Sequence, residues 1–207
     1  WNVPASNIQP KPGKHTIAMF EAIATGDIKG LYVLCTNPAQ SLPNLNKYLD
    51  GLENCFMVVA EAFHPTETSK MADVVLPAAF WGEKEGVYGC TERRSQHMAK
   101  ALEAPGEARW DGDIIIDLAE RMGYGKNFKH FKSPQDVWNE YLKCTKGRDM
   151  DLTGAPYSRL KKVRGLRWPV PSTSHPGTTH RFTKNDPLFP ADKAKGRRMY
   201  FYGKPDG

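Results

Sequence analysis

Three short apolar runs organise the first half of this chain. They cover residues 31–35, 56–60 and 73–77, and the first two stop abruptly at polar residues. Apolar runs of this length, separated by segments that can form helices, are typical of parallel strands that are buried on both faces of a sheet. The order strand, helix, strand, helix, strand predicts an α/β fold with a parallel half-Rossmann sheet flanked by helices and joined by right-handed crossovers.

The segments between and after these runs carry apolar residues at helical spacing. They predict helices over five ranges: 16–25, 44–52, 64–71, 111–122 and 134–143. Asn44 is placed to cap the second of these helices, and Pro134 falls in the first turn of the last, where proline is tolerated. By contrast, residues 78–110 are polar and punctuated by glycine, and we expect no helix of their own there.

The character of the chain changes near residue 150. From Gly154 onward there are seven prolines and six glycines, and in this stretch only residues 199–202 resemble a strand. The stretch is too aromatic for a disordered segment and too interrupted for a core. We therefore predict two parts: an α/β domain over residues 1–150 and an irregular, basic, Pro/Gly-rich connecting arm over residues 151–207.

Positive charge is concentrated in the same arm. Residues 151–207 hold 12 Lys and Arg against 4 Asp and Glu, whereas residues 1–150 hold 17 against 19. A basic segment attracts phosphates, nucleic acid or an acidic surface of the same protein, or it is simply a solvated surface. We expect no nucleic-acid partner, because prolines interrupt the basic residues and they form no helical face.

Other functional classes are excluded by what the sequence lacks. No run of 18 apolar residues is present, so we expect no membrane insertion. The four cysteines form no CxxC pair, and Cys35 and Cys55, which lie in or beside apolar runs, are expected to be small core residues. The chain begins with Trp1 rather than Met, from which we expect it to be a piece of a longer protein.

Polar residues mark the carboxyl ends of the first two predicted strands, the edge at which parallel sheets bind ligands. Asn37 can hydrogen-bond a ligand phosphate, ribose or pterin, or it can equally cap its own turn. Glu61 can accept hydrogen bonds from a ribose hydroxyl or a base edge, or it is a surface carboxylate. No GxGxxG motif is present, so a nucleotide bound here is not held in the manner of NAD.

Charged residues further along the chain can bind phosphate. Lys84 offers a point charge, and Arg93 or Arg94 offers a planar fork, although a solvated loop is the simpler alternative. Asp111 can cap the helix that follows it or bind the edge of a guanine. The six histidines form no HxH or HExxH pattern, and neither a GxSxG elbow nor a ligand set for zinc or iron–sulfur is visible. The residues alone predict a nucleotide-binding α/β domain whose chemistry lies elsewhere.

Several motifs in one order resemble the molybdopterin oxidoreductase family, and within it the catalytic subunits of nitrate reductases. The motifs are LCTNP at 34–38, ADVVLP at 72–77, WGEKEG at 81–86, ERR at 92–94 and PGEAR at 105–109. Two later stretches, RGLRWP at 164–169 and FYGKPDG at 201–207, resemble the periplasmic type. The resemblance covers essentially the whole chain.

This resemblance implies a cofactor and a set of residues that bind it. The family binds two molybdopterin guanine dinucleotides around one molybdenum, and this chain would hold part of one dinucleotide. The positions that match cofactor contacts in the family are Asn37, Ala60, Glu61, Lys84 and Asp111, with Ala60 contributing its backbone. The family often has Asp where Glu61 stands. The family's molybdenum-ligating cysteine and the four cysteines of its 4Fe-4S cluster match no cysteine here, so no metal ligand and no catalytic residue is expected in this chain.

The resemblance also implies the activity, partners and location of an intact enzyme. Such an enzyme reduces nitrate to nitrite by oxygen-atom transfer at molybdenum, and it receives electrons from a cytochrome or a ferredoxin-type protein. The remaining domains of the same subunit would pack against this one. The periplasmic type implies a periplasmic location, and the assimilatory type a cytoplasmic one. The alternatives are an assimilatory nitrate reductase, a formate dehydrogenase or a stand-alone nucleotide-binding module. This chain alone is expected to be inactive.

Overall fold

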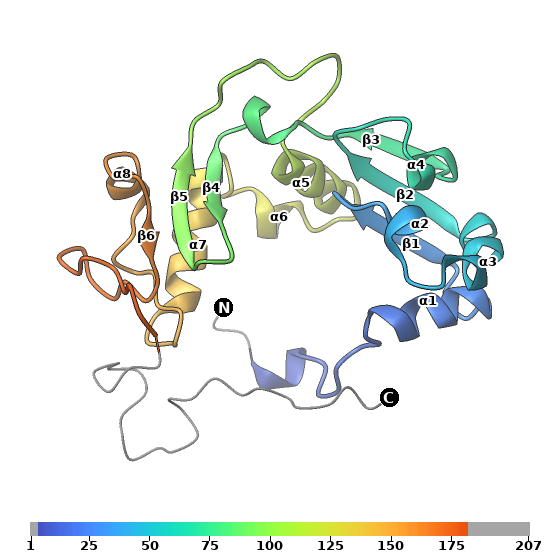
Figure 1. Ribbon diagram of the computed structural model, residues 1–207, viewed down its shortest axis with the longest axis horizontal. Coiled ribbons are helices and arrows are strands. Elements are labelled where there is room, and N and C mark those ends of the chain that lie inside the picture. Colours follow the sequence, from blue (N-terminus) through green and yellow to red (C-terminus); the bar gives the residue numbers. More distant parts are fainter. Residues whose placement is uncertain (1–3, 182–207) are drawn as a thin grey trace. The chain divides into compact units, whose positions relative to one another are not determined.

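A computed structural model describes residues 4–181 of the chain (Figure 1). The chain divides into two compact units. The first, here called the sheet unit, comprises Trp1–Lys84 and Ala99–His130. The second, the hairpin unit, comprises Glu85–Met98 and Phe131–Gly207. The functional division into a cofactor-binding domain and a connecting arm stays a prediction.

The sheet unit is built on three parallel strands, β1 (Gly30–Leu34), β2 (Phe56–Glu61) and β3 (Val74–Pro77). They lie side by side in the order β1-β2-β3 (Figure 1). Val33 of β1 lies opposite Val59 of β2, and both side chains are buried. The predicted parallel sheet is therefore confirmed, and its strands coincide with the three apolar runs.

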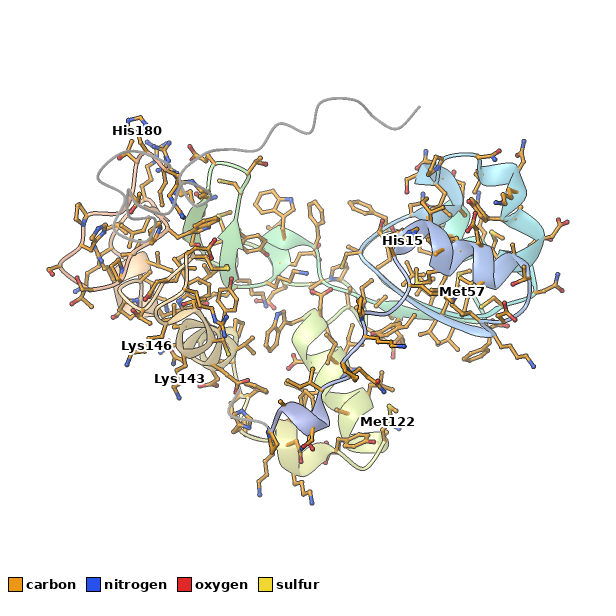
Figure 2. The ribbon with its side chains drawn as sticks, turned by 90° about the horizontal axis from the view of Figure 1, so that it is seen from below. His15, Met57, Met122, Lys143, Lys146 and His180 are labelled. Carbon is orange, nitrogen blue, oxygen red and sulfur yellow. The ribbon has the colours of Figure 1, made fainter. Side chains whose placement is uncertain are left out.

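Helices flank this sheet, as predicted. Among the described residues of the sheet unit, the α-helices are α1 (Thr16–Ala24), α2 (Pro38–Ser41), α3 (Leu49–Glu53), α4 (Glu67–Lys70), α5 (Asp111–Arg121) and α6 (Gly125–Phe128). The short 3-10 helices are η1 (Ala5–Asn7), η2 (Leu45–Lys47) and η3 (Trp81–Glu83). α1 contributes Phe20 and Ile23 to the core, and α3 contributes Leu52. Met57 of β2 lies in the same core and is completely buried (Figure 2).

Two helices in this unit start differently from the prediction. Asn44 occupies the N-cap position of the 3-10 helix η2, but it has φ 54°, in the left-handed region, and its side chain makes no capping hydrogen bond. The helix predicted over 44–52 begins instead as η2 and continues as α3. The helix predicted over 64–71 shortens to α4. Thr66 caps α4 by accepting a hydrogen bond from the Ser69 N–H, and Ser69 accepts one from the Thr66 N–H in return.

The hairpin unit contains strands that the sequence pattern does not predict. β4 (Gly86–Gly89) and β5 (Arg94–Met98) pair antiparallel, and β6 (Leu166–Arg167) adds to β5. Two glycines in β4 and the polar composition of β5 hide the alternation of apolar and polar residues that normally marks a strand. α7 (Pro134–Thr145) packs against β4, and α8 (Tyr157–Leu160) packs against β5.

The predicted arm over residues 151–207 has a core in its described part, which corrects our expectation that the stretch is too interrupted for one. Leu152, Tyr157 and Leu160 are each at most 2% exposed and pack with Trp138 of α7. The secondary structure of the stretch is irregular, as predicted. Its large apolar side chains nevertheless converge on one point, and a core requires that convergence rather than regular strands.

Close backbone contacts hold this irregular core together. A Cβ at Gly154 would lie 2.0 Å from the carbonyl oxygen of Ser172, so only glycine fits there. The Gly154 N–H donates to the Val170 carbonyl at 2.7 Å. The indole N–H of Trp138 donates to the Ala155 carbonyl at 2.9 Å, in a buried position. These bonds satisfy buried backbone groups that a regular strand or helix would pair within itself.

Asp151 ties together the turn that precedes this core. Its carboxylate accepts hydrogen bonds from the Gly147 N–H at 2.7 Å, the Thr153 N–H at 2.9 Å and the Thr153 hydroxyl at 2.7 Å. Burial raises the pKa of Asp151, but these bonds together outweigh burial and hold that pKa below its ordinary value. The stabilisation is therefore complete above the unfolded-state pKa, near pH ~4, and is lost as pH falls through the folded-state pKa.

We expect Asp151→Asn to lower the free energy of unfolding by about 1–3 kcal/mol at neutral pH, because the amide N–H₂ would then face N–H donors. The loss of stability on acidification should also become smaller in this variant. Urea denaturation followed by tryptophan fluorescence at several pH values measures both effects. The exposed Asp149 provides the control, since Asp149→Asn should match the wild type. An acid response in Asp151→Asn equal to that of the wild type would contradict this account.

None of the helices within residues 4–181 is both long and apolar enough to cross a membrane. The strand predicted over residues 199–202 lies outside the described residues.

Candidate functional site

The carboxyl ends of the parallel strands bring together residues that are far apart in the chain. Cys35 directly follows β1, and Glu61 ends β2. Asp111, at the start of α5, contacts Cys35 across a separation of 76 residues, and Lys84 contacts Asp111. In open α/β sheets this edge is where ligands bind. Three of the predicted site residues therefore lie where a ligand of this fold is expected.

Three side chains at the end of β1 form a connected group, here called the Asp111 cluster: Cys35, Lys84 and Asp111. The Asp111 Oδ1 accepts a hydrogen bond from the Cys35 Sγ at 3.2 Å, and its Oδ2 is paired with the Lys84 ammonium. The Lys84 and Asp111 side chains are only 18% and 22% exposed. Trp110 occupies the N-cap position of α5 and Asp111 is the first helical residue, so the capping role considered for Asp111 is wrong.

Two side chains of the Asp111 cluster, Asp111 and Cys35, have shifted pKa values. Partial burial raises the pKa of Asp111, but the hydrogen bonds from Lys84 and Cys35, with the Lys84 charge, outweigh burial and leave that pKa below its ordinary value. Loss of solvent around the Cys35 sulfur raises the pKa of the thiol, and the bond to Asp111 raises it further. At neutral pH Asp111 is therefore a carboxylate and Cys35 a protonated thiol.

Asn37 uses its whole side-chain amide within the protein. Its Oδ1 accepts hydrogen bonds from the Thr68 N–H at 3.1 Å and the Thr68 hydroxyl at 2.6 Å. Its Nδ2 donates to Gln40 at 3.0 Å and to Glu67 at 2.7 Å. Four bonds exhaust the capacity of an amide. Asn37 therefore fastens the start of α2 to α4, and a direct contact with a nucleotide would require it to release one of these partners.

Glu61 lines a cavity of about 330 Å³ at the carboxyl ends of β2 and β3. Its Oε2 accepts a hydrogen bond from the Thr66 hydroxyl at 3.0 Å. His64 and Glu83 line the same cavity, so its wall carries several groups that can bond a polar ligand. A volume of roughly 300–1,000 Å³ is the usual range for pockets that hold small molecules or cofactors.

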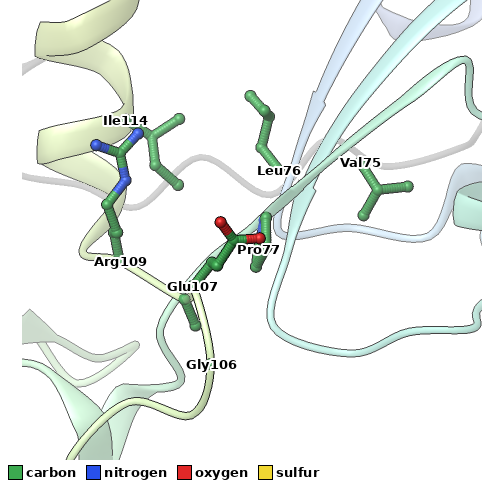
Figure 3. A pocket seen from close by; sticks show the side chains of 8 residues that line it. Val75, Leu76, Pro77, Gly106, Glu107, Arg109 and Ile114 are labelled. Carbon is green, nitrogen blue, oxygen red and sulfur yellow. The ribbon is translucent and has the colours of Figure 1, made fainter.

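A larger cavity of about 560 Å³ lies beside β3 (Figure 3). Because consecutive strand residues point to opposite faces, a cavity lined by both Val75 and Leu76 follows the edge of the strand. Glu107 and Arg109 add charged groups to its wall, and Ile114 adds an apolar one. None of the five predicted cofactor-binding residues lines this cavity, so the Glu61 cavity is the better candidate for a nucleotide.

The arginines considered as a phosphate clamp bind the protein itself. Arg93 donates to three backbone carbonyl oxygens, those of Trp168, Thr178 and Thr179. Arg94 and Arg167 both bond the Glu92 carboxylate, and these bonds lower the pKa of Glu92 to about 2. The guanidinium group of Arg93 is therefore occupied, and that of Arg94 is paired with Glu92 through its Nε, which disfavours the clamp considered above.

Cys35 is a site residue that the sequence pattern does not predict. Of the two cysteines expected in the core, Cys55 is buried but Cys35 is exposed, which corrects the prediction for Cys35. The Cys35 N–H donates to the Ala60 carbonyl at 3.0 Å, while its side chain turns to Asp111. The backbone of Ala60 is predicted to contact the cofactor. Its carbonyl oxygen, however, already accepts this hydrogen bond from Cys35. The available signal was the position of Cys35, the last residue of the apolar run at 31–35.

Taken together, these groups suit an anionic, hydrogen-bonding ligand. The ammonium group of Lys84 can meet phosphate, and the carboxylates of Asp111 and Glu61 can accept hydrogen bonds from hydroxyl or N–H groups. Within residues 4–181, no group of three or more His, Cys, Asp or Glu side chains is arranged to hold a metal ion.

This site and fold agree with a known family. The family model described as molybdopterin oxidoreductase matches residues 2–121, more than half of the chain. The chain therefore belongs to the molybdopterin oxidoreductase family, and the resemblance seen in its motifs is confirmed.

Individual relatives of the chain include nitrate reductases. The chain is 49% identical over its whole length to a nitrate reductase from Symbiobacterium thermophilum and 44% identical to a periplasmic nitrate reductase from Desulfovibrio desulfuricans. It spans only 27% and 28% of the length of these two relatives. Among solved structures it resembles acetylene hydratase from Pelobacter acetylenicus, with a TM-score of 0.60 and 22% identity over 91% of this chain and 26% of that one. That similarity shows the fold alone.

Proposed function

We propose that this chain belongs to the catalytic subunit of a nitrate reductase and holds the guanosine and pyrophosphate part of one molybdopterin guanine dinucleotide. The observation that carries the proposal is that the Asp111 cluster and the Glu61 cavity both lie at the carboxyl ends of a parallel sheet. The identity of 49% with a nitrate reductase supports this choice of enzyme within the family.

The side chains present fit the groups of such a dinucleotide. Lys84 supplies positive charge for the pyrophosphate, and Asp111 and Glu61 accept hydrogen bonds from ribose hydroxyls or from the N–H groups of guanine. The cavity beside Glu61 offers room for the base or the sugar. Asn37 acts mainly by fixing the loop between β1 and α2 to α4, and Ala60 contributes through the backbone of β2. This chain therefore binds and orients the cofactor.

The proposal extends to the intact protein. Its molybdenum cofactor supplies oxygen-atom transfer from nitrate, with the molybdenum ligand and a 4Fe-4S cluster held by other parts of the subunit. Its partners are those remaining domains and an electron-donating cytochrome or ferredoxin-type protein. The 44% identity with a periplasmic nitrate reductase favours a periplasmic location. An assimilatory enzyme in the cytoplasm is the alternative.

Titration of the purified 207-residue chain with GDP in a calorimeter tests the site directly. We expect saturable binding that weakens by at least about tenfold in Asp111→Ala, because the variant loses a hydrogen-bond acceptor for the nucleoside. We expect Lys84→Ala to weaken the binding of GDP more than that of guanosine, since Lys84 serves the phosphates.

The matched control is Asp117→Ala on the same helix. Asp117 pairs with Arg121 at 2.9 Å and with Arg109 at 3.2 Å, away from the Asp111 cluster. This variant should bind GDP like the wild type. A folded chain that shows no GDP binding, or an Asp117→Ala effect as large as that of Asp111→Ala, would count against the proposed site.

A further inference from the structure

The two oxygens of the Asp111 carboxylate have separate partners. Oδ2 is paired with the Lys84 ammonium, the group that we assign to the pyrophosphate. Oδ1 accepts a hydrogen bond from the Cys35 Sγ at 3.2 Å. The side chain is thus held from two directions, and only one of its partners is a cation that a phosphate group can attract away.

The backbone of Cys35 is arranged to bring the thiol to this position. Cys35 has φ 52°, in the left-handed region that residues with a Cβ seldom occupy. Its N–H donates to the Ala60 carbonyl at 3.0 Å, so the backbone is anchored to β2 while the side chain leaves the strand direction. Backbone conformations of this kind gather at functional sites, where the surrounding structure maintains them.

Binding of a phosphate group changes the electrostatic forces on Lys84 and Asp111. The Lys84 ammonium is drawn toward the phosphate oxygens, and the Asp111 carboxylate is repelled by the same negative charge. Without the thiol, the partly exposed Asp111 carboxylate would lose a second side-chain partner as Lys84 turns away, and it would be less firmly held. The Cys35 thiol is neutral at neutral pH, so the phosphate does not compete for it electrostatically.

We propose that Cys35 is a positioning residue of this site: its thiol holds the Asp111 carboxylate in place when Lys84 turns to the phosphate, so that Oδ2 becomes available to a hydroxyl or N–H group of the bound nucleoside. This inference rests on the proposed function, and it assigns Cys35 a role through Asp111 rather than a contact with the ligand.

The test compares Cys35→Ala and Cys35→Ser with the wild-type chain. We expect Cys35→Ala to bind GDP about tenfold more weakly, and Cys35→Ser, which keeps a hydrogen-bond donor, to stay within about threefold of the wild type. Cys90→Ala is the matched control, because Cys90 is also an exposed cysteine but lies in the hairpin unit. It should leave GDP binding unchanged.

A second measurement separates positioning from a general structural effect. Because the Cys35 hydrogen bond lowers the pKa of Asp111, that pKa, followed by carboxyl NMR without ligand, should rise in Cys35→Ala and return toward the wild-type value in Cys35→Ser. An unchanged Asp111 pKa in Cys35→Ala would overturn the inference even if the wild-type chain fails to bind GDP. If the wild type binds GDP and Cys35→Ala binds it equally well, the inference fails while the proposed function stands.

Discussion

Replacing Leu160 by alanine is expected to lower the free energy of unfolding of the hairpin unit by about 2–5 kcal/mol. Leu160 belongs to α8, is 1% exposed, and packs in one cluster with Leu152, Tyr157 and Trp138. Truncation removes buried apolar atoms and leaves a cavity, because the neighbouring backbone is fixed by close contacts such as that between Gly154 and Ser172. A loosely attached arm would tolerate the change.

Urea denaturation followed by tryptophan fluorescence provides the measurement, since Trp138 and Trp168 both belong to the hairpin unit. Hydrogen exchange read by mass spectrometry then shows whether the loss of protection is confined to this unit. Val163→Ala is the control, because Val163 follows α8 but is 37% exposed. This change should cost less than about 1 kcal/mol. Equal denaturation midpoints for Leu160→Ala and the wild type would show that the described part of the arm has no core.

Replacing Gly51 by alanine is expected to lower the free energy of unfolding of the sheet unit by about 1–3 kcal/mol. On helix propensity alone, the same substitution would stabilise a helix by about 1 kcal/mol. In this protein we expect the substitution to destabilise instead, because a Cβ at Gly51 would lie 2.6 Å from the Cα and 2.9 Å from the N of Ala24. These are backbone atoms of α1, so α1 and α3 would have to move apart.

Thermal unfolding followed by circular dichroism measures this effect. The control is Gly13→Ala, since a Cβ at Gly13 would meet no atom within 4 Å. That variant should stay within about 1 kcal/mol of the wild type or gain slightly, because alanine reduces the freedom of the unfolded chain. If Gly51→Ala unfolds at a higher temperature than the wild type, α1 and α3 do not approach closely. Helix propensity would then determine the stability effect of this substitution.

The parallel sheet could be predicted from the sequence because its strands are locally encoded. The runs at 31–35, 56–60 and 73–77 are short and apolar, and each lies in or overlaps an observed strand. The helices α5 and α7 were predictable for a similar reason, because their apolar residues recur with the period of a helix. Such patterns lie within one continuous segment of sequence, so they can be recognised without knowledge of distant residues.

The β4–β5 hairpin and the core of the arm were not predictable in this way. β5 consists of the polar sequence RSQHM, and it is a strand because it pairs with β4 and β6. The core of the hairpin unit joins Trp138 of α7 to leucines beyond residue 150, through turns that contain proline and glycine. Its stability comes from contacts between distant segments, which no short window of sequence contains.

The sequence by itself determined the α/β fold of the first part of the chain, its family, and the candidate residues Asn37, Glu61, Lys84 and Asp111. The tertiary structure alone decided how they are used. It paired Lys84 with Asp111, committed the amide of Asn37 to α4, and brought Cys35 out of the expected core to Asp111, 76 residues away. Residue types set which bonds a side chain can make, but only the path of the chain sets which partners come within reach.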